Sequence, residues 1–294
     1  MGDIRHVAQP GPAPVERIES AVGRCVALEF ELEPGLTLNA ALTGPLLAAG
    51  LGAAQVELSG GAFAPLSYVM PAPSPDADHV AWYSATFAPA GTSRLEKGNV
   101  TFGRRDGAPF LHCHAVWTEP DGRRAGGHIL PHEAVVSEPI RARAFGAAEV
   151  ETTADFDPET NFTLFTPHAR VAPAGGPRIV FARVRPNADI FAAIESLCRR
   201  HGLSAARLRG CVGSLIGARF TAAPELEDFA TEAFITDGTV APDASGAPLA
   251  DLSVALVGLS GALAEGRLAR GQNAVLITFE LALEEVEAEV EVEA

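Results

Sequence analysis

An internal repeat constrains the fold of this chain more than any other feature of its sequence. Residues 33–42 align without gaps on residues 185–194, which lie 152 positions further along. The same offset places Gly50 on Gly202. Similarity at one fixed offset is typical of a duplicated unit, and 294 residues exceed the commonest size of a single domain. The sequence therefore predicts two tandem homologous units.

Each unit begins with an alternating strand pattern, at residues 27–32 and 179–184, followed by a proline turn and a helical segment. In the second unit, Asp189 can cap that helix and Gly202 can end it. In the first unit, Pro45 lies inside the matching segment and predicts a broken or shifted helix. Strand patterns follow. The predicted fold class is α+β, with each unit a mainly antiparallel β-sheet flanked by a helix.

Composition places the boundaries of these units. We predict an N-terminal segment at residues 1–22, a first domain at 23–147, a linker at 148–176 and a second domain at 177–290. The linker prediction rests on a stretch rich in Thr, Asp, Pro and Gly that shows little periodicity. No apolar run approaches the roughly 20 residues of a membrane-spanning helix, and no secretion leader is evident. We expect a cytoplasmic protein without membrane contact.

Charge and motifs exclude several classes of function. The net charge of −15 repels phosphate backbones, which disfavours nucleic acid as a partner. The chain has no Gly-x-Ser-x-Gly elbow, no phosphate-binding glycine loop and no GxGxxG fingerprint, which disfavours serine-hydrolase and nucleotide chemistry. Its four cysteines form no CxxC pair, so neither a disulfide framework nor a zinc ribbon is indicated.

Histidines are concentrated in one short stretch, where four of the eight fall within residues 112–132. Because side chains alternate along a strand, His112 and His114 project from the same face. A Pro-Asp-Gly turn signal then brings His128 back close to His114. His128 shares their face if paired residue numbers sum to 242 or 244, and not if they sum to 243. The two glycines before His128 could also supply a bulge that re-aims it.

Three neutral imidazoles suit a divalent transition metal such as zinc, iron, nickel or copper, with a coordination position left for water or a ligand. We therefore predict a metal site, with zinc as the first choice, at these three histidines. The alternative interpretation is a set of hydrogen-bonded sheet histidines without a ligand. Glu133, Tyr83 and His132 are candidates for groups that contact a ligand or support the metal ligands.

The second unit lacks this pattern. Aligning it on the first places Ser253, Ala255 and Arg267 at the histidine positions, and arginine carries a fixed positive charge where a metal would lie. We predict that the second unit has no such site and serves as a structural or interface copy.

The His-Cys-His strand, the following Gly-Gly-His-Ile-Leu and the closing strand resemble the plants-and-prokaryotes-conserved domain (PPC or PCC domain). The likeness covers roughly residues 25–145 and 177–285. It implies an antiparallel sheet flanked by a helix, assembly into trimers through sheet edges, and metal binding at the positions of His112, His114 and His128. In plants this domain stands beside AT-hook motifs, whose Arg-Gly-Arg-Pro core is absent here.

Three functions follow as hypotheses. The leading one is a metal-binding homo-oligomer, expected to be a trimer, that binds a small molecule at the three-histidine site. The first alternative is a metal-dependent enzyme of lyase or hydrolase type that acts on a small carbonyl or carboxylate compound. The second is a DNA-associated regulator, which the net charge of −15 and the missing AT-hook disfavour.

Overall fold

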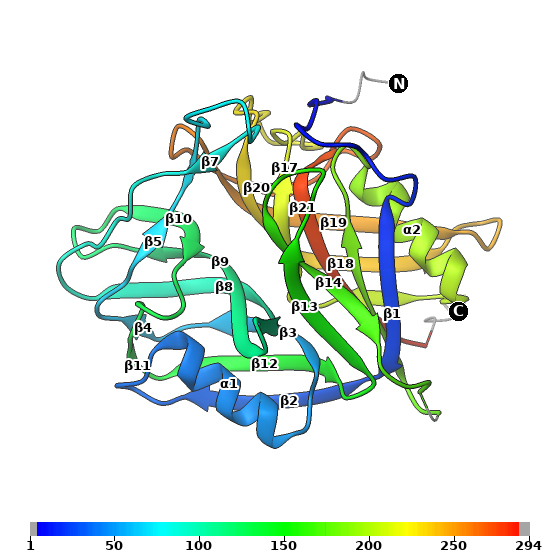
Figure 1. Cartoon of the computed structure of the whole chain (residues 1–294), viewed down its shortest axis with the longest axis horizontal. Helices are drawn as coiled ribbons and strands as arrows, with labels where there is room; N and C mark the ends of the chain where they lie inside the picture. The colour runs from blue at the N-terminus through cyan, green and yellow to red at the C-terminus, as the bar shows by residue number, and fades with distance from the viewer. Residues whose placement is uncertain (1–4, 174, 288–294) are drawn as a thin grey trace, which may run out of the picture.

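A computed structural model of the chain describes residues 5–173 and 175–287. Most of it belongs to two large, mainly antiparallel β-sheets (Figure 1). The strands of the first sheet are β2 (Val26–Leu32), β3 (Ala53–Ser59), β4 (Ala62–Phe63), β5 (Tyr68–Val69), β8 (Ser93–Arg105), β9 (Ala108–Thr118), β10 (Arg124–Ile129), β11 (Val136–Glu138), β12 (Ile140–Ala147), β13 (Val150–Phe156) and β14 (Thr163–Ala169). The strands of the second are β1 (Ile18–Arg24), β15 (Arg178–Val184), β16 (Ala206–Leu208), β17 (Val212–Leu215), β18 (Thr231–Pro242), β19 (Pro248–Gly258), β20 (Leu263–Arg267) and β21 (Val275–Glu285). A small separate ribbon pairs β6 (Pro71–Ala72) with β7 (Trp82–Tyr83).

The two sheets share one strand order. The first runs β2-β12-β3-β8-β9-β10, and the second runs β15-β21-β16-β18-β19-β20. In each set of six, the last strand along the chain lies between the first strand and the second. The same order in two halves of one chain agrees with the duplication inferred from the repeat.

Each sheet is accompanied by one helix, α1 (Leu38–Ala48) or α2 (Ile190–His201). The predicted boundaries of α2 are confirmed. The side chain of Asp189 accepts a hydrogen bond from the backbone of Ala192, and Gly202 ends the helix with a left-handed φ of 62°. Both signals are local, which is why the sequence shows them.

The predicted break in α1 is wrong, because the helix continues through Pro45. Pro45 is exposed, whereas Leu38, Leu42 and Leu46 are fully buried. A proline removes one backbone hydrogen bond, but three buried leucines each contribute about 1.5–3 kcal/mol. Packing against the sheet therefore outweighs the missing bond.

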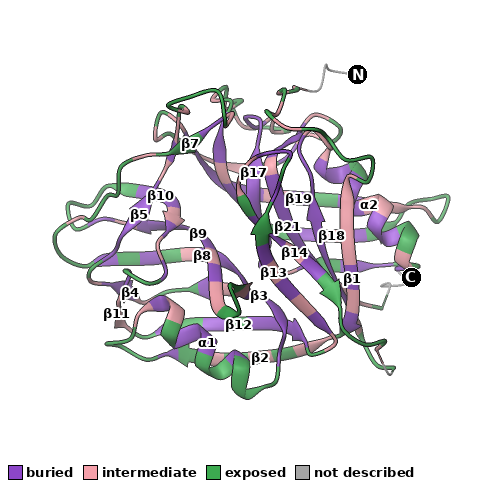
Figure 2. Cartoon of the chain, viewed as in Figure 1, coloured by how far each residue is buried: buried purple, intermediate pink, exposed green. Residues whose placement is uncertain are grey.

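The two sheets pack against each other through their inner faces. The helix-side faces form two separate cores, and buried residues follow the strands through the interior (Figure 2). Between the sheets, Val116 of β9 packs against Phe234 and other residues of the second sheet. The Asn99 side chain donates hydrogen bonds to the backbone oxygens of Cys211 and Ile235, at 3.1 and 2.7 Å. Apolar packing and buried polar contacts thus join the two units.

Parts of the predicted N-terminal segment and linker belong to the sheets. β1 begins inside the predicted segment 1–22 and pairs antiparallel with β15 of the second sheet. Within the predicted linker 148–176, β13 and β14 form an antiparallel hairpin that buries Leu164 and Phe165. The turn-rich composition of the predicted linker did not indicate this hairpin, because β13 and β14 are stabilised by contacts with strands that lie far away in the sequence.

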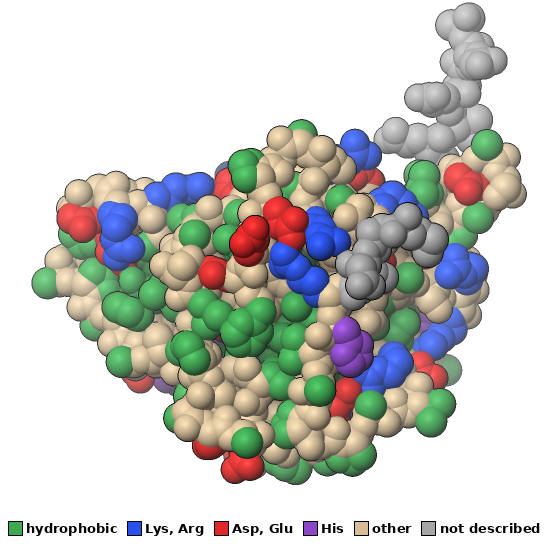
Figure 3. Space-filling model, turned by 90° about the horizontal axis from the view of Figure 1, so that it is seen from above, with side chains coloured by type: hydrophobic (Ala, Val, Ile, Leu, Met, Phe, Trp, Pro, Cys, Tyr) green, Lys and Arg blue, Asp and Glu red, His purple; other side chains and the backbone are tan. Residues whose placement is uncertain are grey.

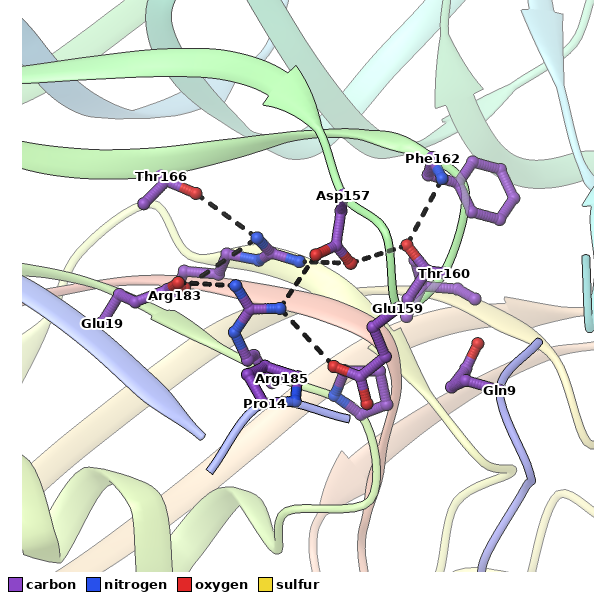
Figure 4. A network of polar contacts seen from close by, with 12 residues as sticks. Gln9, Pro14, Glu19, Asp157, Glu159, Thr160, Phe162, Thr166, Arg183 and Arg185 are labelled. Carbon is purple, nitrogen blue, oxygen red and sulfur yellow. Dashed lines mark hydrogen bonds and ion pairs between the residues drawn. The ribbon is translucent and has the colours of Figure 1, made fainter. Parts of the chain in front are cut away.

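A buried ion network attaches this hairpin to the second sheet (Figure 4). Guanidinium groups of Arg183 and Arg185 lie 2.9 Å from the two carboxylate oxygens of Asp157, and Arg185 also lies 2.6 Å from Glu19 of β1. Burial opposes ionisation of Asp157. The charge of Arg183 and hydrogen bonds from Arg185 and Thr160 outweigh it, and hold the pKa of Asp157 below its ordinary value.

On the face seen in Figure 3, basic side chains lie beside acidic ones, and hydrophobic side chains gather near the middle. An interleaved arrangement of charges differs from the continuous basic stripe that binds a phosphate backbone. Within the described residues, no helix has the length and apolar character needed to cross a membrane.

Candidate metal centre

The hairpin of β9 and β10 brings the three predicted histidines together. His114 pairs directly with His128, which is the register whose residue numbers sum to 242. His112 lies two residues before His114, on the same face of β9, while Cys113 points to the opposite face and is buried in the core of the first unit. The open question of register is therefore decided in favour of a shared face.

The three rings are close to one another. Nε2 of His112 lies 2.9 Å from Nε2 of His114. The ring of His128 lies 4.9 Å from that of His112 and 5.3 Å from that of His114, measured between centroids. His114 is only 1% exposed, whereas His112 and His128 are partly buried.

The second unit supplies two carboxylates to this cluster. Glu232 of β18 places a carboxylate oxygen 2.7 Å from Nε2 of His114. Nδ1 of His112 donates a hydrogen bond of 2.9 Å to Glu280 of β21. Sequence reasoning missed both residues. The available signal was a lone charged residue inside an apolar strand, since Glu280 stands between Phe279 and Leu281.

Hydrogen bonds determine which nitrogen of each ring carries the proton. Nδ1 of His114 donates to the backbone oxygen of Ala233 at 2.9 Å, and Nδ1 of His112 donates to the carboxylate of Glu280. In the neutral rings both Nε2 atoms then carry lone pairs. Two lone pairs 2.9 Å apart, with the Glu232 carboxylate 2.7 Å from one of them, repel unless a cation lies between them. The arrangement therefore has the electrostatics of a site for a proton or a metal ion.

The donor set also fits a metal by number and spacing. One ligand atom from each member of the cluster lies within 4.8 Å of all the others; the members are His112, His114, His128 and Glu232. Atoms bound about 2 Å from a tetrahedral zinc lie roughly 3.3 Å from one another, so small side-chain movements would complete the coordination. Moreover, Nδ1 of His128 is buried and has no hydrogen-bond partner among the described residues. A buried polar nitrogen without a partner is costly unless something binds it.

Electrostatics differ among the histidines. Burial disfavours the charged form of His112, but the charge and hydrogen bond of Glu280, together with Glu232, outweigh it and raise the pKa of His112. Burial lowers the pKa of His128 most, and the neighbouring His112 and His114 lower it further, so this pKa lies well below its ordinary value. The ring of His128 is therefore neutral, as a metal ligand must be.

The three supporting residues predicted from sequence lie in different places. The Tyr83 ring lies 5.5 Å from that of His128, edge to face, so it borders the cluster. His132 and Glu133 are exposed in the turn after β10. The His132 ring lies 6.2 Å from that of Phe110, and neither residue belongs to the metal-ligating group of the described chain.

Two cavities open beside the cluster. The larger, about 310 Å³, has His112 and His128 in its wall together with Tyr83 and Glu280. The smaller, about 60 Å³, is lined by His112, His114, Glu232 and aromatic side chains of the β7 region. A small molecule can therefore reach the rings of the cluster.

The second unit has no equivalent cluster in the part of the chain that the structure describes. Ser253 pairs with Arg267 across β19 and β20, and the Arg267 side chain forms an ion pair with Asp251 at 2.5 Å. Ala255 packs in the contact between the sheets. The second unit instead contributes to the cluster of the first, through β18 and β21.

Comparison with known proteins finds a match to a family model in the second half of the chain. Residues 172–287 match the Plants and Prokaryotes Conserved (PCC) domain. Similar solved structures include a plant- and prokaryote-conserved protein of Pyrococcus horikoshii, with 14% identity over 49% of this chain and 94% of that one, and a TM-score of 0.38. A metal-containing protein of Archaeoglobus fulgidus is 19% identical over 51% of this chain and 99% of its own, with a TM-score of 0.39. A Ralstonia eutropha protein, described provisionally as DNA-binding, is 14% identical over 47% and 88%, with a TM-score of 0.36. No curated protein matches the chain.

Proposed function

We propose that this chain, which carries a Plants and Prokaryotes Conserved domain in its second half, binds one divalent transition metal between its two units. His112, His114 and His128 would hold the ion, and Glu232 would be its fourth ligand. The bound ion would supply a concentrated positive charge at the rings. Zinc is the first choice, because three imidazoles and one carboxylate form a donor set that suits tetrahedral zinc.

One observation carries the proposal. Nε2 of His112 lies 2.9 Å from Nε2 of His114, and Nε2 of His114 lies 2.7 Å from a carboxylate oxygen of Glu232. Two imidazole lone pairs and a carboxylate oxygen therefore lie close together. Each ring is held in this orientation by a hydrogen bond from its other nitrogen. Oriented in this way, metal-binding histidines lose little freedom when the ion binds.

Metal analysis of protein purified without a histidine tag tests the proposal. We expect about one equivalent of metal per chain in the wild type and none in the His112→Ala/His114→Ala variant. The His168→Ala variant is the matched control, because His168 is exposed and does not belong to the metal-ligating group of the described residues. Equal, negligible metal in wild type and double variant, after incubation with zinc and removal of the excess, would remove the site.

A metal-dependent lyase or hydrolase that acts on a small carbonyl or carboxylate compound is the second candidate. The cavity that reaches His112 and His128 favours it. A fourth protein ligand counts against it, because catalytic zinc sites commonly keep one position open. Turnover of a small-molecule panel that stops on chelation and returns with metal would support an enzyme. Loss of metal without loss of any turnover would exclude it.

A DNA-associated role has the least support, because the net charge of −15 opposes binding to phosphates. A gel shift with random duplex DNA at low salt would show retention if backbone contacts exist. Assembly into a cytoplasmic homotrimer stays a proposal from the sequence resemblance. Light scattering on purified protein would give three times the chain mass of 30.6 kDa if it holds.

A further inference from the structure

The larger cavity beside the histidine cluster has one cationic side chain in its wall. Apart from the cluster, its walls are mostly apolar, with Val69, Leu130, Ala154, Leu164 and Phe165 among them. Arg105 is the cation. Mostly apolar walls with a few charged or polar groups are typical of a site for a small amphipathic molecule.

Arg105 is held close to the cavity by an aromatic ring. Its guanidinium carbon lies 5.4 Å from the centroid of the Phe110 ring, a cation–π arrangement. Phe110 and His112 lie on the same face of β9, two residues or roughly 7 Å apart along the strand, so the guanidinium packs on the ring next to the cluster. The cation therefore lies near one end of the cavity and the histidines near the other.

The guanidinium of Arg105 has donors to spare. Its ion pair with Asp106 is long, at 3.9 Å, and Asp106 is 95% exposed, so water screens the attraction. No hydrogen bond joins Arg105 to any other described residue. By contrast, the neighbouring Arg104 donates to the backbone oxygen of Gly107 and lies 3.4 Å from Glu151. The Arg105 guanidinium, whose side chain is 47% exposed, therefore lines the cavity without a close carboxylate partner among the described residues.

We propose that this cavity binds a small carboxylate with an apolar, preferably aromatic body, whose carboxylate pairs with Arg105. A guanidinium matches a carboxylate with two parallel hydrogen bonds. The body of the ligand would lie against Phe110 and Phe165, whose ring centroids are 5.9 Å apart, and its far end would reach His112 and His128. Glu280 at that far end repels the carboxylate, which fixes the direction of binding. The inference goes beyond the proposed metal binding by adding a small-molecule ligand, and its carboxylate site does not depend on a bound metal.

Fluorine NMR with two matched probes tests it. 3-(4-Fluorophenyl)propionate and its neutral amide, 3-(4-fluorophenyl)propionamide, have nearly the same size and differ in charge. We expect the acid to bind the wild type about tenfold more tightly than the amide, and Arg105→Gln to reduce this preference to about one. The Arg104→Gln variant is the matched control and should keep the preference, since its side chain contacts Gly107 and Glu151.

A second variant separates the cavity from the surface around the arginine. Ala154 is 7% exposed and lines the cavity, so Ala154→Leu should weaken both probes at least fivefold while leaving their ratio unchanged. Equal binding of the two probes to the wild type would overturn the inference. So would a preference that survives Arg105→Gln, or probe binding that Ala154→Leu leaves unaltered in a folded variant.

The titrations are run on zinc-loaded and on chelator-treated protein, with metal content measured in each. An Arg105-dependent preference in protein that takes up no zinc would support the carboxylate site and refute the proposed metal site. Zinc uptake without any preference for the acid would do the reverse.

Discussion

Replacing Glu280 with glutamine tests whether the second unit supports the metal ligands of the first. Glu280 is 3% exposed and accepts a hydrogen bond of 2.9 Å from Nδ1 of His112. Glutamine keeps the size and an acceptor oxygen but loses the charge. A hydrogen bond to a charged group contributes about 1.5–3 kcal/mol, against about 0.5–1.5 kcal/mol for a neutral pair. The loss of about 1.4 kcal/mol corresponds to tenfold weaker metal binding, at the lower end of the effect of such supporting groups.

Zinc affinity is measured at pH 8 by competition with a chromophoric chelator, which limits interference from protonated histidine. The control is Glu284→Gln on the same strand, where the carboxylate accepts a hydrogen bond of 2.7 Å from Arg209 instead. We expect Glu284→Gln to bind zinc like the wild type. If Glu280→Gln also binds zinc like the wild type, with an unchanged melting temperature, the supporting role assigned to Glu280 is wrong.

Three further predictions concern stability. Zinc at about 100 times its Kd should raise the free energy of unfolding by about 2.7 kcal/mol, seen by calorimetry as a higher Tm that a chelator reverses; an unchanged Tm would contradict the site. Asp157→Asn should destabilise the protein by about 3–5 kcal/mol, because it leaves Arg183 and Arg185 short of a buried partner; urea unfolding that shows a change below 1 kcal/mol would refute this. The folded-state pKa of Asp157 is depressed. The contribution of its ionised carboxylate to the free energy of unfolding is therefore complete above about pH 4 and is lost as pH falls through the folded pKa. The wild type should then lose more stability than Asp157→Asn between pH 5 and pH 2. Asn99→Ala should cost about 1–3 kcal/mol, since two buried backbone oxygens lose their donor; an equal denaturation midpoint for both proteins would argue against this contact.

Local signals in the sequence predicted local structure well. The limits of α2 follow from a capping Asp189 and a terminal Gly202, both of which act within a few residues. Strand alternation and one turn predicted the β9–β10 hairpin and the shared face of His112 and His114, while the structure decided the register that brings His128 to that face. By contrast, Pro45 predicted a break that does not occur, because the burial that stabilises α1 depends on a sheet assembled from distant strands.

The carboxylates of the cluster could not be predicted in the same way. Glu280 is 168 residues from His112 in the sequence, and it reaches the ring only because the inner faces of the two sheets pack together. The aligned positions of the second unit indicated a copy without a site. Aligning equivalent positions shows only which residues each unit has for a site of its own. Glu232 and Glu280 instead contact histidines of the first unit across the contact between the units.

The amino-acid sequence by itself determined the duplication, the helix limits of the second unit and two histidines on one strand face, with a third on the returning strand. These depend on periodicity, turns and caps, whose energies arise between residues close together in the chain. Only the tertiary structure decided which charges meet those histidines, that the segment between the units folds as a hairpin, and where a cavity opens. Such features arise from packing of surfaces far apart in sequence, and no local pattern encodes which surfaces will meet.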